Sequence, residues 1–337
     1  MIQHLRNRLA TSRGGIFVLA TLVVGSMLML SSCKGDRQKP APESAPAAAT
    51  PNAADFDPPA NAPAAGKVEG KRAIQYTKEI VDFGPRPVGS PTHIKVENYI
   101  KSNVQGLQVE EDKFTGNTVV GNFPMNNIIA KIPGKKDGII VLASHYDTNY
   151  PLRNENFVGA NDGASTSALL IELANQLKAK PNDGYSIWFV FTDGEEAMVE
   201  WSDKDKLYGT RHLASKWQKD GTAAKIKAFI LLDMIGDKDL NVEHDGNSTP
   251  WLLDVVGRAA QRTGNQSYFY GREQAVDDDH MPFKDIGVPV ADIIDLNYGF
   301  NNLYHHTTED TMDKLSANSL QVVGDTVLEI IRALNTK

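Results

Sequence analysis

The chain has 337 residues, a single cysteine and a formal net charge of −7 at pH 7. An acidic composition without a basic cluster argues against nucleic acid as a partner. A single cysteine excludes an internal disulfide, and the sequence contains no CxxC pair, Gly-rich phosphate loop, internal repeat or GxSxG nucleophile motif.

Residues 1–32 have the pattern of an export signal. Three arginines and no acidic residue precede an apolar run over residues 16–30. This run is short for a membrane helix, which needs about 20 residues, and small residues follow it. We therefore interpret residues 1–32 as a cleaved signal peptide. The alternative is an uncleaved helix that anchors the chain.

The one cysteine, Cys33, ends the sequence LSSC at residues 30–33. This sequence resembles the lipobox of bacterial lipoproteins, in which the cysteine is acylated and becomes the mature N-terminus. Several acyl chains on one residue anchor a protein stably in a membrane. Because Lys34 rather than aspartate follows the cysteine, the resemblance implies an exported lipoprotein facing the periplasm, with the outer membrane favoured.

Residues 33–66 are predicted to form a disordered Ala/Pro-rich tether that begins at the lipidated cysteine. They contain no aliphatic residue larger than alanine, so they bury too little apolar surface to fold alone. A structured proline-rich arm is the alternative. Residues 67–337 are long enough for one large α/β domain with a buried core.

Four short apolar runs in this domain end in polar residues and are predicted to be strands of one sheet. Their near-continuous β-branched and aliphatic character is typical of strands buried on both faces. They alternate with helical patterns, which predicts an α/β fold with a mainly parallel, twisted sheet and helices on both faces. The predicted strands are residues 138–144, 185–191, 228–232 and 288–294, and the predicted helices are residues 164–180, 207–217, 250–263 and 316–334.

The polar residues that follow these strands carry the candidate chemistry. His145 follows the first strand, Glu195 and Glu196 follow the second, and Asp233 follows the third. Because the site in such sheets lies beyond the carboxyl ends of the strands, we expect these side chains to meet in one crevice. Two adjacent carboxylates are costly to bury unless a cation neutralises one of them. Imidazole and carboxylate groups without thiolates suit zinc.

Five motifs, in this order, resemble the zinc-dependent aminopeptidase fold: ASHYDT, FVGANDGAS, FTDGEEA, LLDMIG and HHTTEDT. Within that fold, the block DGEEAMVEWSDKDKLYGTRHLA at residues 193–214 and the motif DDDHMPF resemble animal-type glutaminyl-peptide cyclotransferases, or glutaminyl cyclases. The segment FGPRPVGSP at residues 83–91 fits the same family. The resemblance covers residues 72–334.

The resemblance implies one zinc ion per chain, held by Asp162, Glu196 and His306, with the fourth position left for substrate or water. The implied reaction cyclises the N-terminal glutamine of peptides and proteins to pyroglutamate and releases ammonia. Zinc would polarise the side-chain carbonyl, and the substrate's own α-amine would attack it.

Five other residues have roles implied by the resemblance. Glu195 would carry the proton from the amine to the departing nitrogen, and Asp233 and Asp278 would belong to a hydrogen-bond network around that proton. Trp201 would form a flat apolar wall for the glutaminyl side chain. The family usually has a tryptophan immediately before the zinc histidine. This chain has His305 there, which would remove apolar wall without disabling the chemistry.

The main alternative is a zinc-dependent aminopeptidase, which hydrolyses N-terminal residues with two metals. Asp162 would then bridge the metals. His145 and Glu196 would complete one site, and Asp233 and His306 the other. All five residues are present. Glutaminyl cyclases retain this histidine and aspartate yet use one zinc, so His145 is either a second-metal ligand or a supporting residue of the first site.

Other features of the sequence favour either the cyclase or the aminopeptidase. The block at residues 193–214 and Asp278 favour the cyclase, whereas the loop GANDGAS looks more like the peptidase version. A third reading is a lipid-anchored binding protein without activity. Such a protein would be expected to have lost Glu195 or a metal ligand, and none is missing.

Overall fold

The computed structural model describes residues 50–337. The predicted signal peptide, the predicted lipidation site Cys33 and the first part of the predicted tether lie outside the described residues. No helix within residues 50–337 is both long enough and apolar enough to cross a membrane.

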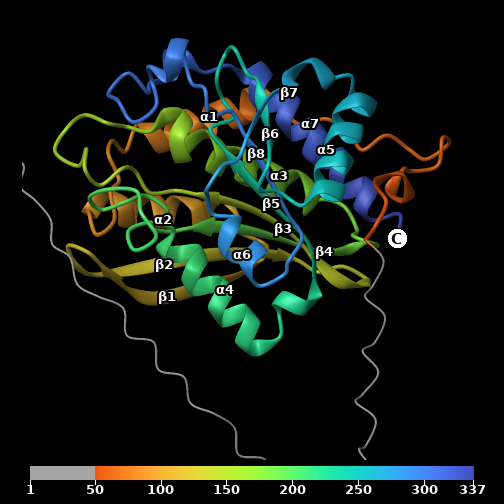
Figure 1. Cartoon of the computed structure of the whole chain (residues 1–337), viewed down its shortest axis with the longest axis horizontal. Coiled ribbons are helices and arrows are strands. Elements are labelled where there is room, and N and C mark those ends of the chain that lie inside the picture. The colour runs from red at the N-terminus through yellow and green to blue at the C-terminus, as the bar shows by residue number, and fades with distance from the viewer. Residues whose placement is uncertain (1–49) are drawn as a thin grey trace, which may run out of the picture. The chain divides into compact units, whose positions relative to one another are not determined.

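A six-stranded sheet forms the centre of the domain (Figure 1). Its strands lie in the order β1, β2, β4, β3, β5 and β8. The pairs β1–β2 and β2–β4 are antiparallel and the other three are parallel, so within this sheet only β2 opposes the rest. The mainly parallel sheet is therefore confirmed. The strands are β1 Gln108–Thr118, β2 Gly121–Ile132, β3 Lys136–His145, β4 Tyr185–Thr192, β5 Ile226–Asp233 and β8 Val290–Ile294.

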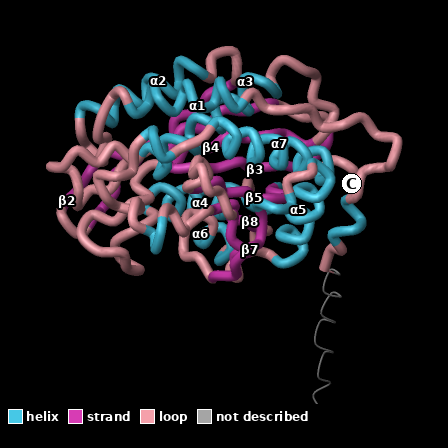
Figure 2. The backbone as a smooth tube through the Cα atoms, turned by 90° about the horizontal axis from the view of Figure 1, so that it is seen from above, coloured by secondary structure: helices cyan, strands magenta, loops and turns pink. Residues whose placement is uncertain are grey.

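Helices cover both faces because successive residues of the central strands point to opposite sides. On β5, Ile230 and Leu232 enter the larger apolar core, whereas Phe229 and Leu231 enter the smaller one. Helices α1, α2, α3, α5 and α7 contribute to the larger core, and α1 lies between α3 and α7 (Figure 2). Helices α4 and α6 contribute to the smaller core. The helices are α1 Gly70–Val81, α2 Pro91–Asn103, α3 Thr166–Leu177, α4 Tyr208–Asp220, α5 Pro250–Thr263, α6 Met281–Asp285 and α7 Ala317–Leu334.

All the predicted strands and helices are present, and α5 has the predicted bounds. Helix α3 begins two residues later than predicted, because residues 160–165 form a separate π-helical turn. Three features were not predicted: the β1–β2 hairpin, the helices α1, α2 and α6, and a small parallel sheet of β6 (Val242–Asp245) and β7 (Phe269–Gln274).

The tether prediction needs correction for residues 50–66. Residues 53–56 form a short 3-10 helix, and the Phe56 ring stacks on Trp251 at 5.1 Å between centroids. The Asp57 carboxylate accepts hydrogen bonds from Arg258 Nε at 2.8 Å and Arg262 Nη1 at 2.7 Å. One aromatic ring and one carboxylate therefore attach this segment to α5 despite its lack of large aliphatic residues.

Candidate active site

The polar ends of three parallel strands meet at one edge of the sheet. His145 ends β3 and is paired in register with Thr192 at the end of the adjacent β4, just before the DGEE segment. Asp233 ends β5, on the other side of β3. The predicted convergence of these side chains is therefore present.

The loop that carries Asp162 has an unusual backbone. Asp162 has φ −81° and ψ 99° within the turn Ala160–Ser165, and Gly163 has a positive φ of 82°. A Cβ atom at Gly163 would lie only 2.9 Å from the His145 ring and 3.0 Å from the Asp147 carbonyl oxygen. A glycine is needed here because only its absent side chain lets the loop approach β3 closely enough to place Asp162 in the site.

The three predicted metal ligands lie together. His306 Nε2 is 3.3 Å from Asp162 Oδ2 and 3.3 Å from Glu196 Oε2. Each of these two distances matches the edge of a tetrahedron around an ion with bonds of about 2.0 Å, so His306 is placed to share an ion with each carboxylate. The ligand atoms of Asp162, His305 and His306 all lie within 4.8 Å of one another. Asp162 Oδ2 and Glu196 Oε1 are buried and have no hydrogen-bond partner among the described protein atoms. The donor set therefore fits one divalent cation such as zinc.

A second group shares Asp162. His145 Nε2 lies 3.1 Å from Asp162 Oδ1 and 3.4 Å from Asp233 Oδ1, and all three side chains are buried. The pairing expected for a two-metal site was wrong, because His145 lies with Asp233 and Glu196 lies with His306. The loops after β4 and before α3 bring Glu196 to the opposite side of Asp162.

Glu195, adjacent to a predicted metal ligand, lines a cavity of about 340 Å³. Burial, together with the charges of Glu196 and Asp278, raises the pKa of Glu195 well above its ordinary value, and His145 opposes this shift. A carboxyl group with a raised pKa suits a residue that must both accept and return a proton near neutral pH.

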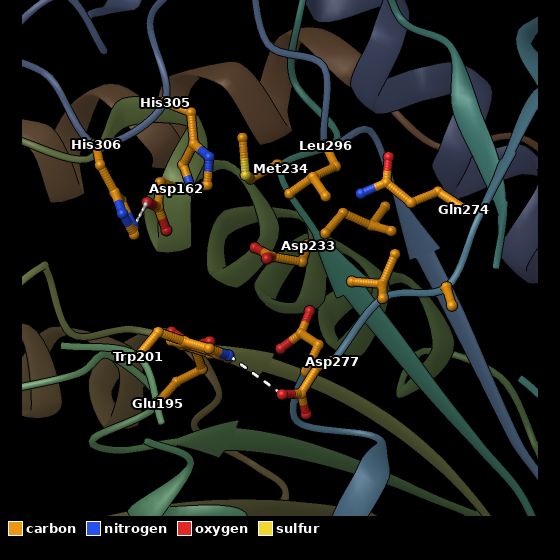
Figure 3. A pocket seen from close by; sticks show the side chains of 14 residues that line it. Asp162, Glu195, Trp201, Asp233, Met234, Gln274, Asp277, Leu296, His305 and His306 are labelled. Carbon is orange, nitrogen blue, oxygen red and sulfur yellow. Dashed lines mark hydrogen bonds and ion pairs between the residues drawn. The ribbon is translucent and has the colours of Figure 1, made fainter. Parts of the chain in front are cut away.

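The same cavity is lined by most of the other predicted site residues (Figure 3). Asp162, His305 and His306 stand along one wall, Glu195 and Trp201 along another, and Asp233 lies between them. Asp278 also lines the cavity. These side chains come from loops that span residues 162 to 306, so the fold brings together residues that are distant in the sequence. Glu196 and His145 contact this set from outside the cavity lining.

Trp201 is held at the rim by two charged residues. Its indole Nε1 donates to Asp277 Oδ2 at 3.3 Å (Figure 3), and the Lys206 ammonium group also contacts Asp277. Lys206 lies 5.6 Å from the Trp201 ring centre, within cation–π range. The Asp277–Lys206 pair thus links the loop after β4 to the DDDH loop across the cavity.

His305 occupies the position of the expected family tryptophan. Neighbouring residues determine the protonation state of its ring. Burial, together with the charge of His306, lowers the pKa of His305 to about 4, so the ring is neutral at neutral pH. Its Nδ1 accepts a hydrogen bond from the Asn302 side chain at 3.0 Å. The remaining proton therefore lies on Nε2, and His305 supplies a hydrogen-bond donor.

Two residues that hold the Asp162 loop were not predicted. Arg86 is fully buried, and its guanidinium donates to the carbonyl oxygens of Tyr146 at 2.7 Å, Gly159 at 2.9 Å and Asp162 at 3.1 Å. Burial lowers the pKa of Arg86 to about 10, and the Asp162 charge opposes this, so Arg86 remains a cation beside the acidic site.

Asp310 holds the other side of this loop. Its carboxylate accepts from the backbone N–H groups of Asn161 at 2.7 Å and Asp162 at 3.1 Å, and from the Tyr298 hydroxyl at 2.9 Å. Arg86 lies in the motif FGPRPVGSP, and Asp310 lies in the motif HHTTEDT. An arginine between two prolines and an acid after the histidine pair were the available signals.

Comparison with family profiles assigns this fold and site to a known family. Residues 127–331 match the profile of Peptidase family M28. This match covers more than half of the chain.

Comparison with individual proteins narrows the assignment. A glutaminyl-peptide cyclotransferase of Drosophila melanogaster is 32% identical over 65% of this chain and 70% of its own length. A solved glutaminyl cyclase from an Acidobacteriales bacterium is 54% identical with a TM-score of 0.80, covering 83% of this chain and 99% of that one. The glutaminyl cyclase of Porphyromonas gingivalis is 30% identical with a TM-score of 0.71, covering 80% and 98%. The chain belongs to the glutaminyl cyclases within Peptidase family M28.

Proposed function

We propose that the protein cyclises the N-terminal glutamine of peptides and proteins to pyroglutamate and releases ammonia. The observation that carries this proposal is the placement of Glu195. Its carboxyl group lines the same cavity as two of the metal ligands, Asp162 and His306, with Trp201 as a neighbouring wall. A substrate there has a proton acceptor beside the metal set.

Asp162, Glu196 and His306 would hold one zinc ion. When bound, zinc supplies a Lewis acid that polarises the side-chain carbonyl of the substrate glutamine. Asn149 supports this set, because its side-chain nitrogen donates to Glu196 Oε2 at 2.8 Å and so orients the carboxylate. We propose a single metal because the resemblance to glutaminyl cyclases implies one zinc ion per chain, and the relatives described above are glutaminyl cyclases.

The chemistry needs one proton carrier and no external nucleophile. The α-amine of the substrate attacks the δ-carbon of its own side chain, and a new C–N bond closes the five-membered ring. Glu195 accepts a proton from the amine and delivers it to the departing amide nitrogen, whose C–N bond breaks to release ammonia. Asp233 and Asp278 line the cavity around this path and would hold the amine through hydrogen bonds.

The walls of the cavity suit a glutaminyl side chain. Trp201, Val276 and Leu296 offer apolar surface for its methylene groups. The Nε2–H of His305 would donate to a carbonyl oxygen of the substrate. A neutral donor at this position avoids repelling the metal or the cationic form of the substrate amine.

Peptide hydrolysis is the second candidate function. The observation that favours it is the group His145, Asp162 and Asp233, whose ligand atoms are also close enough to share an ion. Asp162 would then bridge two metals, and an activated water would attack the first peptide bond.

One assay separates the two functions. The protein is incubated with zinc and a peptide that begins with glutamine, and the products are identified by mass spectrometry. Cyclisation gives a single product lighter than the substrate by one ammonia. Free glutamine and a peptide shortened by one residue would instead establish an aminopeptidase and overturn the proposal.

A further inference from the structure

We infer that a second hollow beside the catalytic cavity binds the side chain of the second residue of the substrate peptide and prefers an apolar one. This inference rests on the proposed function and deepens it. The hollow has a volume of about 290 Å³ and lies between the loop after β3 and the loop after β4. Its apolar walls are Pro151, Leu152, Ala197 and Val199.

The hollow adjoins the catalytic cavity. Trp201 and His306 line both spaces. They stand at one end of the catalytic cavity, away from Gln274 at the other end (Figure 3). With its amine at Glu195 and its side-chain carbonyl at the metal set, a bound glutamine lies next to these shared walls. The following residue begins within about 3.5 Å of chain length, so its side chain reaches the second hollow.

Three of the polar groups that line this hollow are already engaged. Glu196 and His306 belong to the metal set, and the Asn149 side chain donates to Glu196 at 2.8 Å. These groups therefore offer little hydrogen bonding to a polar side chain, whose burial would cost free energy.

The exposed surface of the hollow is apolar with one negative charge. Val199 is 61% exposed, and Leu152 is half-buried. Burying a substrate side chain against such surface is favourable in proportion to the apolar area removed from water. Glu200 also lines the hollow and is exposed. Its carboxylate would repel an acidic side chain, so the expected preference is leucine over glycine over aspartate.

The test measures kcat/KM on three peptides that begin Gln-Leu, Gln-Gly or Gln-Asp and are otherwise identical. For the native protein, we expect the Leu peptide to exceed the Gly peptide by roughly fivefold, as partial burial of a leucine side chain implies. The Asp peptide is expected below the Gly peptide. Equal values for all three peptides would overturn the inference while leaving the proposed function intact.

Two variants locate the effect in the hollow. Val199→Asp should bring the Leu-to-Gly ratio down to about one, because it replaces apolar wall with a charge. Glu200→Gln should raise the Asp-to-Gly ratio several-fold. Ile94→Asp is the matched control, since Ile94 is an aliphatic residue of α2 that is 55% exposed and lines neither space. It should leave all ratios unchanged.

The outcomes distinguish this inference from the proposed function. If none of the three peptides is cyclised, the proposed function fails and this inference fails with it. If all are cyclised but Val199→Asp lowers kcat/KM equally for each, the hollow does not select the second residue, and only this inference is overturned.

Discussion

At the residue scale, the adjacent carboxylates of Glu195 and Glu196 have different environments. Glu196 Oε2 lies 3.3 Å from His306 Nε2 and accepts from Asn149, which directs it to the metal set. Glu195 lines the cavity instead, and its backbone N–H donates to Asp147 Oδ1 at 3.3 Å. Neighbouring positions can therefore serve as a ligand and a proton carrier because the chain turns sharply between them.

Glu195→Gln should abolish turnover without removing the metal. The amide has the same shape but cannot accept the amine proton, so kcat should fall by roughly 10²- to 10⁴-fold. Activity is measured by ammonia release, and metal content by elemental analysis of the same preparation. Loss of bound metal from this variant would show that Glu195, rather than Glu196, is a ligand.

Metal content distinguishes the two groups that share Asp162. We expect about one zinc per native chain, and His306→Ala should lower this value severely because it removes one of three ligands. His145→Ala should retain the metal. The measurement is metal content after dialysis against metal-free buffer. Two ions per native chain, with one lost from His145→Ala, would contradict the single-metal proposal.

At the scale of elements, α2 anchors the loop that carries Glu195 and Glu196. His93 Nε2 lies 2.7 Å from Asp193 Oδ1, and the backbone N–H of Asn126 on β2 donates to Asp193 Oδ2 at 2.8 Å. His93 Nδ1 lies 3.4 Å from Glu97 on the same helix. The buried His93 imidazole therefore connects α2 to the segment that directly follows β4.

The stabilisation from His93 should depend on pH. Burial alone would lower its pKa, but the charge and hydrogen bond of Asp193, with the Glu97 contact, raise the pKa to about 10. The folded pKa thus exceeds the unfolded value of about 6.5, so the stabilisation is complete below pH 6.5 and is lost as pH rises towards 10.

The His93→Gln variant tests this dependence. At pH 6, it should unfold with a free energy lower than that of the native protein by roughly 3 kcal/mol, since it leaves a buried carboxylate without its cation. The difference should shrink steadily between pH 6.5 and 10. Urea unfolding of both proteins at several pH values measures this difference in free energy. A difference that stays constant with pH would show that the shape of His93, rather than its charge, stabilises the fold.

At the scale of the whole molecule, residues 50–66 belong to the folded domain and lie far from the chemistry. Phe56 shares a hollow with Tyr185 and Ile226, which begin β4 and β5, whereas the site lies at the carboxyl ends of these strands. A chain that starts at residue 67 should therefore be less stable but equally active.

We expect this truncation to lower the free energy of unfolding by about 1–3 kcal/mol relative to a chain that starts at residue 50. It removes the Phe56–Trp251 stacking and the ion pairs of Asp57 with α5. Phe56→Ala in the longer chain should reproduce part of the loss. Thermal unfolding measures the change, and equal stability of the two chains would show that the segment contributes nothing.

Attachment to a membrane is a separate proposal for residues that precede the described domain. We propose that Cys33 is acylated after signal cleavage and anchors the protein at the periplasmic side of a membrane, the outer one being favoured. The native protein should incorporate labelled palmitate and sediment with membranes. Cys33→Ser should incorporate none. A Cys33→Ser variant that remains in the membrane at full length would instead indicate an uncleaved helix.

Local sequence determined most of the elements that support the site. Helix α5 could be placed at Pro250–Thr263 because its start has a proline and Gly264 follows it, and both signals act within one turn. The central strands were recognisable because burial on both faces requires continuous apolar residues. The hairpin strand β1 was not recognisable, because it lies at the edge and most of its side chains are at least partly exposed.

The sequence by itself therefore determined the class of fold and predicted a set of candidate ligands and catalytic residues. Only the tertiary structure decided that His145 faces Asp233 while His306 faces Glu196, and that Arg86 and Asp310 hold the Asp162 loop from positions 76 and 148 residues away. Helical hydrogen bonds join residues four apart, so short patterns reveal them. Contacts in the site depend on strand order and loop paths, which are set by packing across the whole domain.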